Sequence, residues 1–207
     1  MINPFCMLVA GSSQTGKTKW VCDLLKQRRS LFTQAPGPIH VFYREWQAIF
    51  EELEDAHFHQ TMPTMQSLKA LAHQNATVVI DDMIHHVTRE TAELFTVGSS
   101  RYRANIIFIT QNLFDKNPFF RTISLNCKYI CIRKNPRDSS SIMHFAKQVV
   151  PANSRFLVQV YRDVTSQKAF SYLFFDASQQ TREMMRLRTN ILSEGGQPMQ
   201  CFNSDRL

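Results

Sequence analysis

The sequence predicts an α/β fold, an open sheet with crossover helices on both faces. Short runs of β-branched, aliphatic and aromatic residues alternate with stretches of helical periodicity, which is the pattern of strands joined by helices. Some runs are almost continuously apolar, as in Thr77-Val78-Val79-Ile80, and this is typical of strands covered on both faces. A glycine-containing loop between the first such run and the first helical stretch fits the same class.

This alternation places each expected element. The strands are expected at Phe5–Ala10, Ile39–Tyr43, Thr77–Asp81, Ile106–Thr110, Tyr129–Arg133 and Tyr172–Asp176. The helices are expected at Gly16–Arg29, Glu45–Leu53, Thr64–His73, Thr88–Phe95, Ser139–Val149 and Ser154–Val164. Apolar residues at helical spacing in the first helix are expected in the core: Trp20, Val21, Leu24 and Leu25.

The length of the chain sets its domain organisation. At 207 residues and 43% hydrophobic, it has the size of one domain with a sizeable core. We expect that domain at residues 1–180 and a basic, polar C-terminal tail at residues 181–207. Periodicity fades from about Thr181, and Gly195, Gly196 and Pro198 lie in a polar stretch. The tail is therefore expected to order only against another subunit or DNA.

Composition limits the compartment and the partners. No apolar run approaches the roughly 20 residues that span a bilayer, and the first residues lack the basic start of a secretion signal, so neither membrane contact nor export is expected. The five cysteines form no CxxC pair, and their odd number favours a reducing compartment. The net charge of +7 permits binding to nucleic acid or to an acidic partner, although an ordinary solvated surface gives the same balance.

A phosphate-binding loop follows the first expected strand. It has the pattern G-x-x-x-x-G-K-[ST], and its residues are Gly11, Ser12, Ser13, Gln14, Thr15, Gly16, Lys17 and Thr18. In such a loop, backbone N–H groups and a helix N-terminus converge on the phosphates of a nucleotide. Lys17 is expected to reach the β- and γ-phosphates, and the Thr18 hydroxyl is expected to bind Mg²⁺. The sequence thus predicts a P-loop NTPase that uses ATP and Mg²⁺.

Two acids end the strand Thr77–Asp81. An ATPase needs a carboxylate at a strand end to hold Mg²⁺ through its water shell, and often a second acid to polarise the attacking water. Asp81 is expected to serve Mg²⁺ and Asp82 to activate water. A buried strand that ends in two acids is costly unless a cation lies nearby, which favours this interpretation. The alternative is that Asp82 only caps the segment that follows.

An amide and several arginines are candidates for the rest of the site. Gln111 follows the strand Ile106–Thr110 and is expected to sense the γ-phosphate or orient water, although an amide at this position could also cap a loop. An arginine finger often completes such a site, from the same or a neighbouring subunit. The candidates, among which sequence physics does not choose, are Arg101, Arg103, Arg121, Arg133 and Arg137.

Histidine and cysteine pairs elsewhere are expected to be structural. His57 and His59, like the His85-His86 pair, have no cysteine or acid at a recognised zinc spacing. Cys127 and Cys131 lack a second pair and are expected to be small apolar fillers.

Several sequence blocks, taken in order, resemble a known family. These are the phosphate loop, the Val-Ile-Asp-Asp strand, Ile109-Thr110-Gln111-Asn112-Leu113-Phe114, Arg121-Thr122-Ile123-Ser124-Leu125-Asn126, Lys134-Asn135-Pro136-Arg137-Asp138 and Arg186-Leu187-Arg188-Thr189-Asn190-Ile191. They look like the genome-packaging ATPases of Polinton/Maverick elements and adintoviruses, which belong with the poxvirus-type packaging ATPases in the FtsK/HerA superfamily. The likeness covers nearly the whole chain, and its later blocks are far more specific than its nucleotide motifs.

This resemblance implies a fold and a function. The fold would be a RecA-like (ASCE) sheet in which the strand before Gln111 lies between the strands of the phosphate loop and of Asp81. The protein would form an oligomeric ring that pumps double-stranded DNA into a preformed capsid, with a capsid or portal protein as a further partner. Its location would be the host nucleus or a cytoplasmic virion assembly site.

The resemblance also bears on individual residues. It implies that Arg137 is the finger acting on a neighbouring subunit, with Arg101 and Arg103 as second choices. The superfamily often has Asp-Glu where this chain has Asp81-Asp82. The shorter carboxylate of Asp82 must come closer to the attacking water than a glutamate would.

Three functions remain open from the sequence. The first is the DNA-translocating packaging motor. The second is a nucleoside or nucleotide kinase, which also uses a phosphate loop but has an arginine-rich lid and no need for Gln111. The third is a non-catalytic assembly protein that binds nucleotide only to set its oligomeric state, for which Asp82 would be dispensable.

Overall fold

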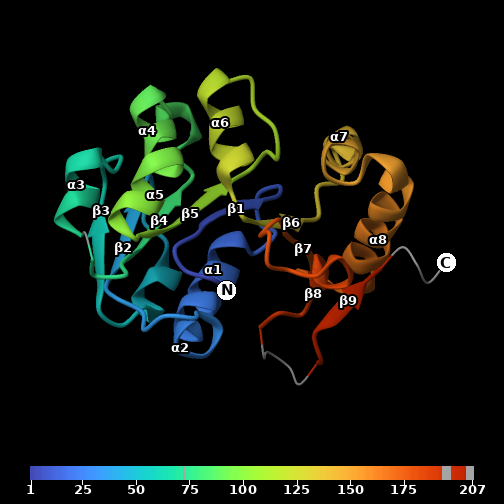
Figure 1. Ribbon diagram of the computed structural model, residues 1–207, viewed down its shortest axis with the longest axis horizontal. Coiled ribbons are helices and arrows are strands. Elements are labelled where there is room, and N and C mark those ends of the chain that lie inside the picture. The colour runs from blue at the N-terminus through green and yellow to red at the C-terminus, as the bar shows by residue number, and fades with distance from the viewer. Residues whose placement is uncertain (72, 193–196, 204–207) are drawn as a thin grey trace.

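The centre of the molecule is a mixed sheet with helices on both faces (Figure 1). The computed structural model describes residues 1–71, 73–192 and 197–203. Within these residues the strand order is β3-β2-β4-β5-β1-β6-β7-β8-β9. The strands are β1 (Cys6–Ala10), β2 (Ile39–Tyr43), β3 (Ala56–His59), β4 (Thr77–Asp81), β5 (Asn105–Thr110), β6 (Tyr129–Arg133), β7 (Tyr172–Asp176), β8 (Leu187–Thr189) and β9 (Gln200–Phe202).

Helices and single helical turns connect the strands. The α-helices of the described residues are α1 (Lys17–Lys26), α2 (Arg28–Leu31), α3 (Met65–Ala70), α4 (Arg89–Glu93), α5 (Ser99–Tyr102), α6 (Pro118–Asn126), α7 (Ser139–Val149) and α8 (Ser154–Gln167). The short turns are η1 (Ala48–Glu52), η2 (Ile84–His86), η3 (Leu94–Gly98), η4 (Pro151–Asn153) and η5 (Glu183–Met185).

The sheet is parallel from β3 to β6 and antiparallel beyond. Strand β5 pairs in parallel with both β1 and β4, with Cys6 opposite Ile106 and Thr77 opposite Asn105. This confirms that the strand before Gln111 lies between the phosphate-loop strand and the Asp81 strand. Strands β7, β8 and β9 run antiparallel to their neighbours. The carboxyl ends of β1, β4 and β5 therefore meet at one edge of the sheet.

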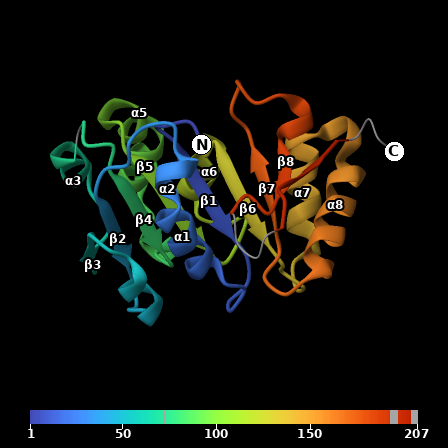
Figure 2. The ribbon, with the colours of Figure 1, turned by 90° about the horizontal axis from the view of Figure 1, so that it is seen from below.

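Two hydrophobic layers cover the faces of the sheet. Alternate strand residues, such as Leu8 and Val9 of β1, enter opposite layers, as the pleat of a strand requires. One layer holds the buried residues of α1 together with Phe50 of η1. The other holds buried residues of α3 to α8 with the exception of α5, which contributes Tyr102 at its margin. Figure 1 shows α1 and α2 below the sheet and α4 and α6 above it, and Figure 2 shows the sheet from the α1 side. The expected α/β fold with helices on both faces is confirmed.

The expected strands are all present, and their bounds agree to within one residue. The apolar stripe of α1 is buried as expected, because Trp20, Val21, Leu24 and Leu25 are each at most 3% exposed. Strand β3 was not expected. It is a short edge strand whose sequence, Ala-His-Phe-His, lacks the apolar run that marks the inner strands.

The helices differ more from expectation. The predicted helix Glu45–Leu53 is wrong, because that segment forms only the 3₁₀ turn η1, which already buries Phe50 against the α1 layer. Helix α6 was not expected, although the sequence carries its start signal: Asn117 accepts a hydrogen bond from the backbone of Phe119, and Pro118 occupies the first turn. The other expected helices are present, with ends that differ by at most three residues.

Part of the predicted tail belongs to the sheet. Strand β8 pairs with β7, placing Leu187 opposite Phe175, and β9 pairs with β8. Asp176 accepts hydrogen bonds from Ser178, Thr181 and Arg188, which ties this segment to the end of β7. The expectation that the tail orders only against another subunit or DNA is therefore wrong for β8 and β9. Gly195 and Gly196 lie outside the described residues, and the boundary at residue 181 stays a prediction.

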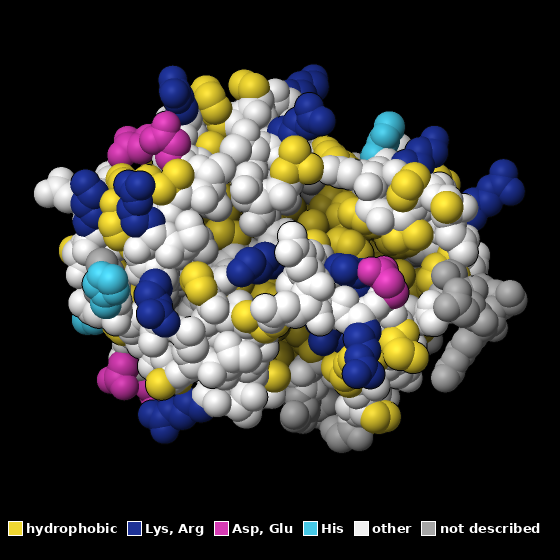
Figure 3. Space-filling view, viewed as in Figure 1, with side chains coloured by type: hydrophobic (Ala, Val, Ile, Leu, Met, Phe, Trp, Pro, Cys, Tyr) yellow, Lys and Arg dark blue, Asp and Glu magenta, His cyan; other side chains and the backbone are white. Residues whose placement is uncertain are grey.

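The basic residues are dispersed on the face of the molecule seen in Figure 3. Lys and Arg side chains are scattered over this face without a single continuous patch. In the part of the chain that the structure describes, no helix is both long and apolar enough to cross a bilayer.

Candidate nucleotide-binding site

The predicted site residues gather at the carboxyl edge of β1, β4 and β5. The phosphate loop, residues 11–18, joins β1 to α1, while Asp81 ends β4 and Gln111 follows β5. Between them lies a cleft of about 370 Å³, which we call the nucleotide cleft. Its lining residues include Ser13, Gln14, Gly16, Lys17, Thr18, Lys19, Gln47, Ile49, Asp81, Asp82 and Gln111. A crevice at the ends of parallel strands is where open α/β folds bind ligands.

Glycine is needed at two positions of the phosphate loop. A Cβ on Gly11 would lie 2.7 Å from the Cβ of Arg133, so the loop can pass β6 this closely only without a side chain. Gly16 has φ of 74° and ψ of 28°, a left-handed conformation that glycine adopts without strain. Gly16 is also the N-cap of α1, and no side chain caps this helix. The first N–H groups of α1 are thus left for an anion.

Lys17 folds back onto the phosphate loop. Its Nζ donates a hydrogen bond to the backbone oxygen of Ser12 at 2.9 Å, and Thr15 Oγ1 donates to the same oxygen at 2.7 Å. Burial lowers the pKa of Lys17, while Asp81 and Asp82 oppose that shift. A polyphosphate in the cleft would offset the burial and draw the ammonium group toward it.

Asp81 is a buried acid with two hydrogen-bond donors. Its Oδ2 accepts a hydrogen bond from Thr18 Oγ1 at 3.2 Å and another from Gln47 Nε2 at 2.7 Å. Burial, with a smaller contribution from nearby Asp82, raises the pKa of Asp81 to about 6 against the lowering effect of Thr18 and Lys17. An acid that is unfavourable as an isolated anion is stabilised by a cation, and hydroxyl and carboxylate oxygens suit Mg²⁺. Thr18 and Asp81 therefore fit this ion.

Asp82 and Gln111 lie together at the mouth of the nucleotide cleft. Gln111 Nε2 donates a hydrogen bond to Asp82 Oδ1 at 3.4 Å. Asp82 is half-buried and has φ of 53°, in the left-handed region, which turns the chain sharply away from β4. Its backbone N–H donates to the oxygen of Ile109, so the turn is fixed against β5. Both side chains line the nucleotide cleft, and the catalytic roles of both residues stay predictions.

Gln47 was missed by the sequence analysis. It lies after β2, which pairs with β4, so its position at the same sheet edge follows from the strand order. A glutamine in a polar stretch has no motif of its own. Only the strand order, which the sequence alone does not give, could have identified Gln47.

Arg133 is wrong as a candidate finger, because it is buried in its own subunit with 3% exposure. Its guanidinium donates hydrogen bonds to the backbone oxygens of Thr15, at 2.9 Å, and Phe170, at 2.5 Å. It also lies 5.3 Å from the ring centre of Tyr172. Arg133 therefore supports the phosphate loop from behind.

The other candidate arginines are exposed: Arg101, Arg103, Arg121 and Arg137. None of them lines the nucleotide cleft of the described chain. Arg137 lies on the loop that follows β6, where its backbone N–H donates to Asn135 Oδ1 at 3.3 Å. Arg103 donates to Gln34 Oε1 at 3.3 Å, on the opposite edge of the sheet from the site.

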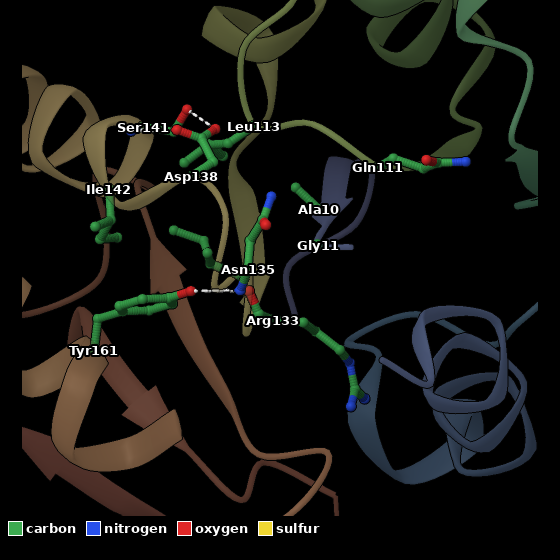
Figure 4. Close-up of a pocket in the computed structure, with 11 residues that line it drawn as sticks. Ala10, Gly11, Gln111, Leu113, Arg133, Asn135, Asp138, Ser141, Ile142 and Tyr161 are labelled. Carbon is green, nitrogen blue, oxygen red and sulfur yellow. Dashed lines mark hydrogen bonds between the residues drawn. The ribbon is translucent and has the colours of Figure 1, made fainter. Parts of the chain in front are cut away.

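The loop that carries Arg137 is tied to the phosphate loop. Ser12 Oγ donates to the oxygen of Lys134 at 3.1 Å, and the Tyr161 hydroxyl accepts from the N–H of Asn135 at 3.0 Å while donating to the oxygen of Arg133. Figure 4 shows Asn135 between Gly11 and Tyr161 in a small pocket behind the phosphate loop, with the Arg133 side chain leading toward α1. The two loops are therefore held together by direct hydrogen bonds and by the Tyr161 hydroxyl.

None of the paired histidines and cysteines lines the nucleotide cleft of the described chain. His57 and His59 belong to β3, where both stack on His40 of β2. Cys127 and Cys131 are fully buried, and burial raises the pKa of Cys131 to about 12. Among the residues that the structure describes, no group of three or more His, Cys, Asp or Glu is arranged to hold a metal ion.

Comparison with known proteins identifies the fold. No family model matches the sequence, and no curated protein matches it significantly. The structure of the genome packaging NTPase B204 from Sulfolobus turreted icosahedral virus 2 with sulfate matches with a TM-score of 0.60 at 13% identity, over 87% of this chain and 95% of that chain. The same protein with ATP-gammaS gives 0.55 at 14% identity, over 86% and 94%.

A third structure gives the same result. B204, the DNA-packaging ATPase from Sulfolobus turreted icosahedral virus, matches with a TM-score of 0.60 at 12% identity, over 87% of this chain and 96% of that chain. At such identities the likeness concerns the fold alone. The chain thus has the α/β fold, with a mixed and mostly parallel sheet, of P-loop genome-packaging NTPases.

Proposed function

We propose that this protein is an ATP-hydrolysing motor that moves double-stranded DNA into a capsid. The observation that carries the proposal is the convergence of the phosphate loop, buried Asp81, Asp82 and Gln111 on one cleft, with β5 between β1 and β4. The similar structures, described as genome-packaging NTPases and in one case bound to ATP-gammaS, support it. The order of motifs along the whole chain agrees, and we infer membership of the poxvirus-type branch of the FtsK/HerA superfamily.

The residues of the cleft have separate tasks in this mechanism. Lys17 and the N-terminus of α1 hold the phosphates, while Thr18 and Asp81 hold Mg²⁺, which would neutralise charge on the β- and γ-phosphates. Gln111, through its hydrogen bond to Asp82, orients that carboxylate toward the attacking water. Asp82 then accepts a proton from this water as the water oxygen attacks the γ-phosphorus. The bond between the γ-phosphorus and the β–γ bridging oxygen breaks, and ADP and phosphate are the products.

The last element of the mechanism comes from a second copy of the chain. Arg137 is exposed on the loop after β6 and lies outside the nucleotide cleft of its own subunit, which supports a role on a neighbour. A finger that acts between subunits implies repeated head-to-tail contacts, as in a closed ring. In this proposal DNA passes through the ring, a capsid or portal protein docks it, and the complex works in the host nucleus or at a cytoplasmic assembly site.

A translocation assay tests this function. Long duplex DNA carrying a triplex-forming third strand is incubated with the protein, and release of that strand is measured with ATP and with a non-hydrolysable analogue. We expect release with ATP only, and none with Asp82→Asn. Tight DNA binding and ATP hydrolysis without release of the third strand would contradict a motor.

Two further measurements, of phosphate transfer to a nucleoside and of oligomeric state, separate the alternatives. A kinase would transfer phosphate to an added nucleoside and would not respond to DNA. A nucleotide-dependent assembly protein would oligomerise with ATP while Asp82→Asn left its behaviour unchanged.

A further inference from the structure

A second cleft lies on the other side of the phosphate loop. It has a volume of about 280 Å³ and is bounded by Trp20 of α1, by Phe170 and Ser171 before β7, and by Asn190 after β8. We call it the side cleft. Because β7 and β8 are antiparallel to each other and β7 is antiparallel to β6, the start of β7 and the end of β8 lie at the edge that carries the phosphate loop. No task in the hydrolysis mechanism above falls on its residues.

The two clefts are adjacent where Gly16 of the nucleotide cleft lies against Phe170 of the side cleft. A Cβ on Gly16 would lie 3.2 Å from Cδ1 of Phe170, so the loop and this ring are in direct contact. The hydrolytic groups Asp81, Asp82 and Gln111 all line the nucleotide cleft and none lines the side cleft. A triphosphate whose γ-phosphate faces those groups has to direct its nucleoside away from them. The side cleft is one such direction.

Phe170 has an unusual position for an aromatic residue. It is 64% exposed, the highest value among the large hydrophobic side chains of the described residues. Its φ of 66° lies in the left-handed region, which is a strained conformation for a bulky side chain. Burial does not explain this strain, because the ring lies at the surface. Strained residues that the surroundings hold in place are concentrated at binding sites.

A buried arginine holds Phe170 and the phosphate loop in one arrangement. The same nitrogen of Arg133 donates to the backbone oxygens of Phe170 and Thr15. Arg133 is 3% exposed and lies over the ring of Tyr172, so its own position is fixed by packing. The Phe170 backbone is thereby placed relative to the site of the phosphates before any ligand binds, which reduces the ordering cost of binding.

We propose that the side cleft receives the nucleoside of the bound triphosphate and that Phe170 stacks on its base. This inference rests on the proposed nucleotide site and deepens it by assigning the base. Stacking on an aromatic face accepts any base, and a purine covers more of the ring than a pyrimidine does. The amides of Asn190 and Gln197 lie on the rim, within 3.5 Å of each other, and offer donors and acceptors to the base edge. Purine triphosphates are thus preferred to pyrimidine triphosphates.

Binding measurements with and without the base test the proposal. Dissociation constants for ATP, CTP and inorganic tripolyphosphate are measured by calorimetry on the full chain. Phe170→Ala is expected to weaken ATP binding about 10-fold, a loss in the range that base stacking provides, and to leave tripolyphosphate binding unchanged. Phe170→Trp is expected to retain ATP binding. Phe119→Ala, which removes an exposed phenylalanine of α6, is the matched control and should leave the dissociation constants for ATP and tripolyphosphate unchanged.

Other outcomes overturn the proposal. Equal weakening of ATP and tripolyphosphate by Phe170→Ala would mean that the residue only supports the phosphate loop. Loss of ATP affinity in Ile49→Ala but not in Phe170→Ala would place the base in the nucleotide cleft instead. Failure of the proposed function would give a different result. If the protein is not a motor, the third strand stays on the DNA in the translocation assay, while the dependence of ATP affinity on Phe170 remains. If no triphosphate binds to the unaltered chain, both proposals fail.

Discussion

At the scale of single residues, Asp81 shows how a functional site reduces stability. Its side chain is 3% exposed at the end of a strand that is otherwise apolar, and burial raises its pKa to about 6. The hydrogen bonds from Thr18 and Gln47 offset part of the cost of that charge, but not all of it. Without a cation in the cleft, ionised Asp81 therefore lowers the free energy of unfolding.

Asp81→Asn is expected to stabilise the nucleotide-free protein and to abolish hydrolysis. Because the folded pKa of about 6 exceeds the ordinary 3.8, the unaltered chain loses stability as pH rises through that window. The variant should show no such loss, so its advantage should be small at pH 4 and reach up to about 3 kcal/mol above pH 6. Urea unfolding at several pH values, without nucleotide or Mg²⁺, measures this.

Asp55→Asn removes an exposed carboxylate and serves as the control for the change in net charge. Its unfolding free energy should stay close to that of the unaltered chain at each pH. If the two variants had the same free energy of unfolding at each pH, burial of the Asp81 carboxylate would not destabilise the folded protein.

The residues that sequence could identify are those with a motif. The phosphate loop, Asp81, Asp82 and Gln111 were found because spacing or strand ends mark them, and the structure brings them to one cleft. Gln47, Arg133 and Phe170 have no such mark. Their positions depend on which strands are neighbours, and Arg133 remained a candidate finger until β6 was placed beside β1 and the phosphate loop.

At the scale of elements, the inner parallel strands are the most predictable part of the fold. Their apolar runs are long enough to be recognised, and each expected strand is present. The short strands β3, β8 and β9 could not be recognised because they bury few side chains, and their pairing depends on distant parts of the chain. The same reason explains why a break in periodicity near Thr181 suggested a tail where the sheet continues.

Leu187→Ala tests whether β8 belongs to the domain. Leu187 is 5% exposed and packs with the layer that contains Phe175, so its truncation should cost about 2–4 kcal/mol of unfolding free energy. Met185→Ala, at 36% exposure two residues earlier, should cost less than about 1 kcal/mol. Chemical denaturation of both variants makes the comparison. Equal, small costs would show that β8 adds nothing to the stability of the sheet.

At the scale of the whole molecule, the exposed positions of the arginines are the notable feature. Arg137 lies on a loop that is tied to the phosphate loop through the hydrogen bond from Ser12 to Lys134. In the proposed ring, this contact would link the phosphate loop of one subunit to the arginine that the subunit offers to its neighbour. In the proposed ring, Lys and Arg side chains that are dispersed as on the face in Figure 3 would contact DNA phosphates from several subunits rather than from one patch.

The most direct test of a motor with shared sites is steady-state ATP hydrolysis by a mixture of two inactive variants, with long double-stranded DNA present. Lys17→Ala lacks its own phosphate contact and Arg137→Ala lacks the finger, so each alone should hydrolyse at least about 100-fold more slowly than the unaltered chain. In the mixture, the Arg137 of one variant completes the site of the other. Recovery of roughly a quarter of normal turnover, rising more than linearly with protein concentration, is the predicted result. Two results together would contradict a motor with shared sites. The mixture would hydrolyse ATP no faster than either variant alone, and the turnover of the unaltered chain would be linear in protein concentration and unaffected by DNA.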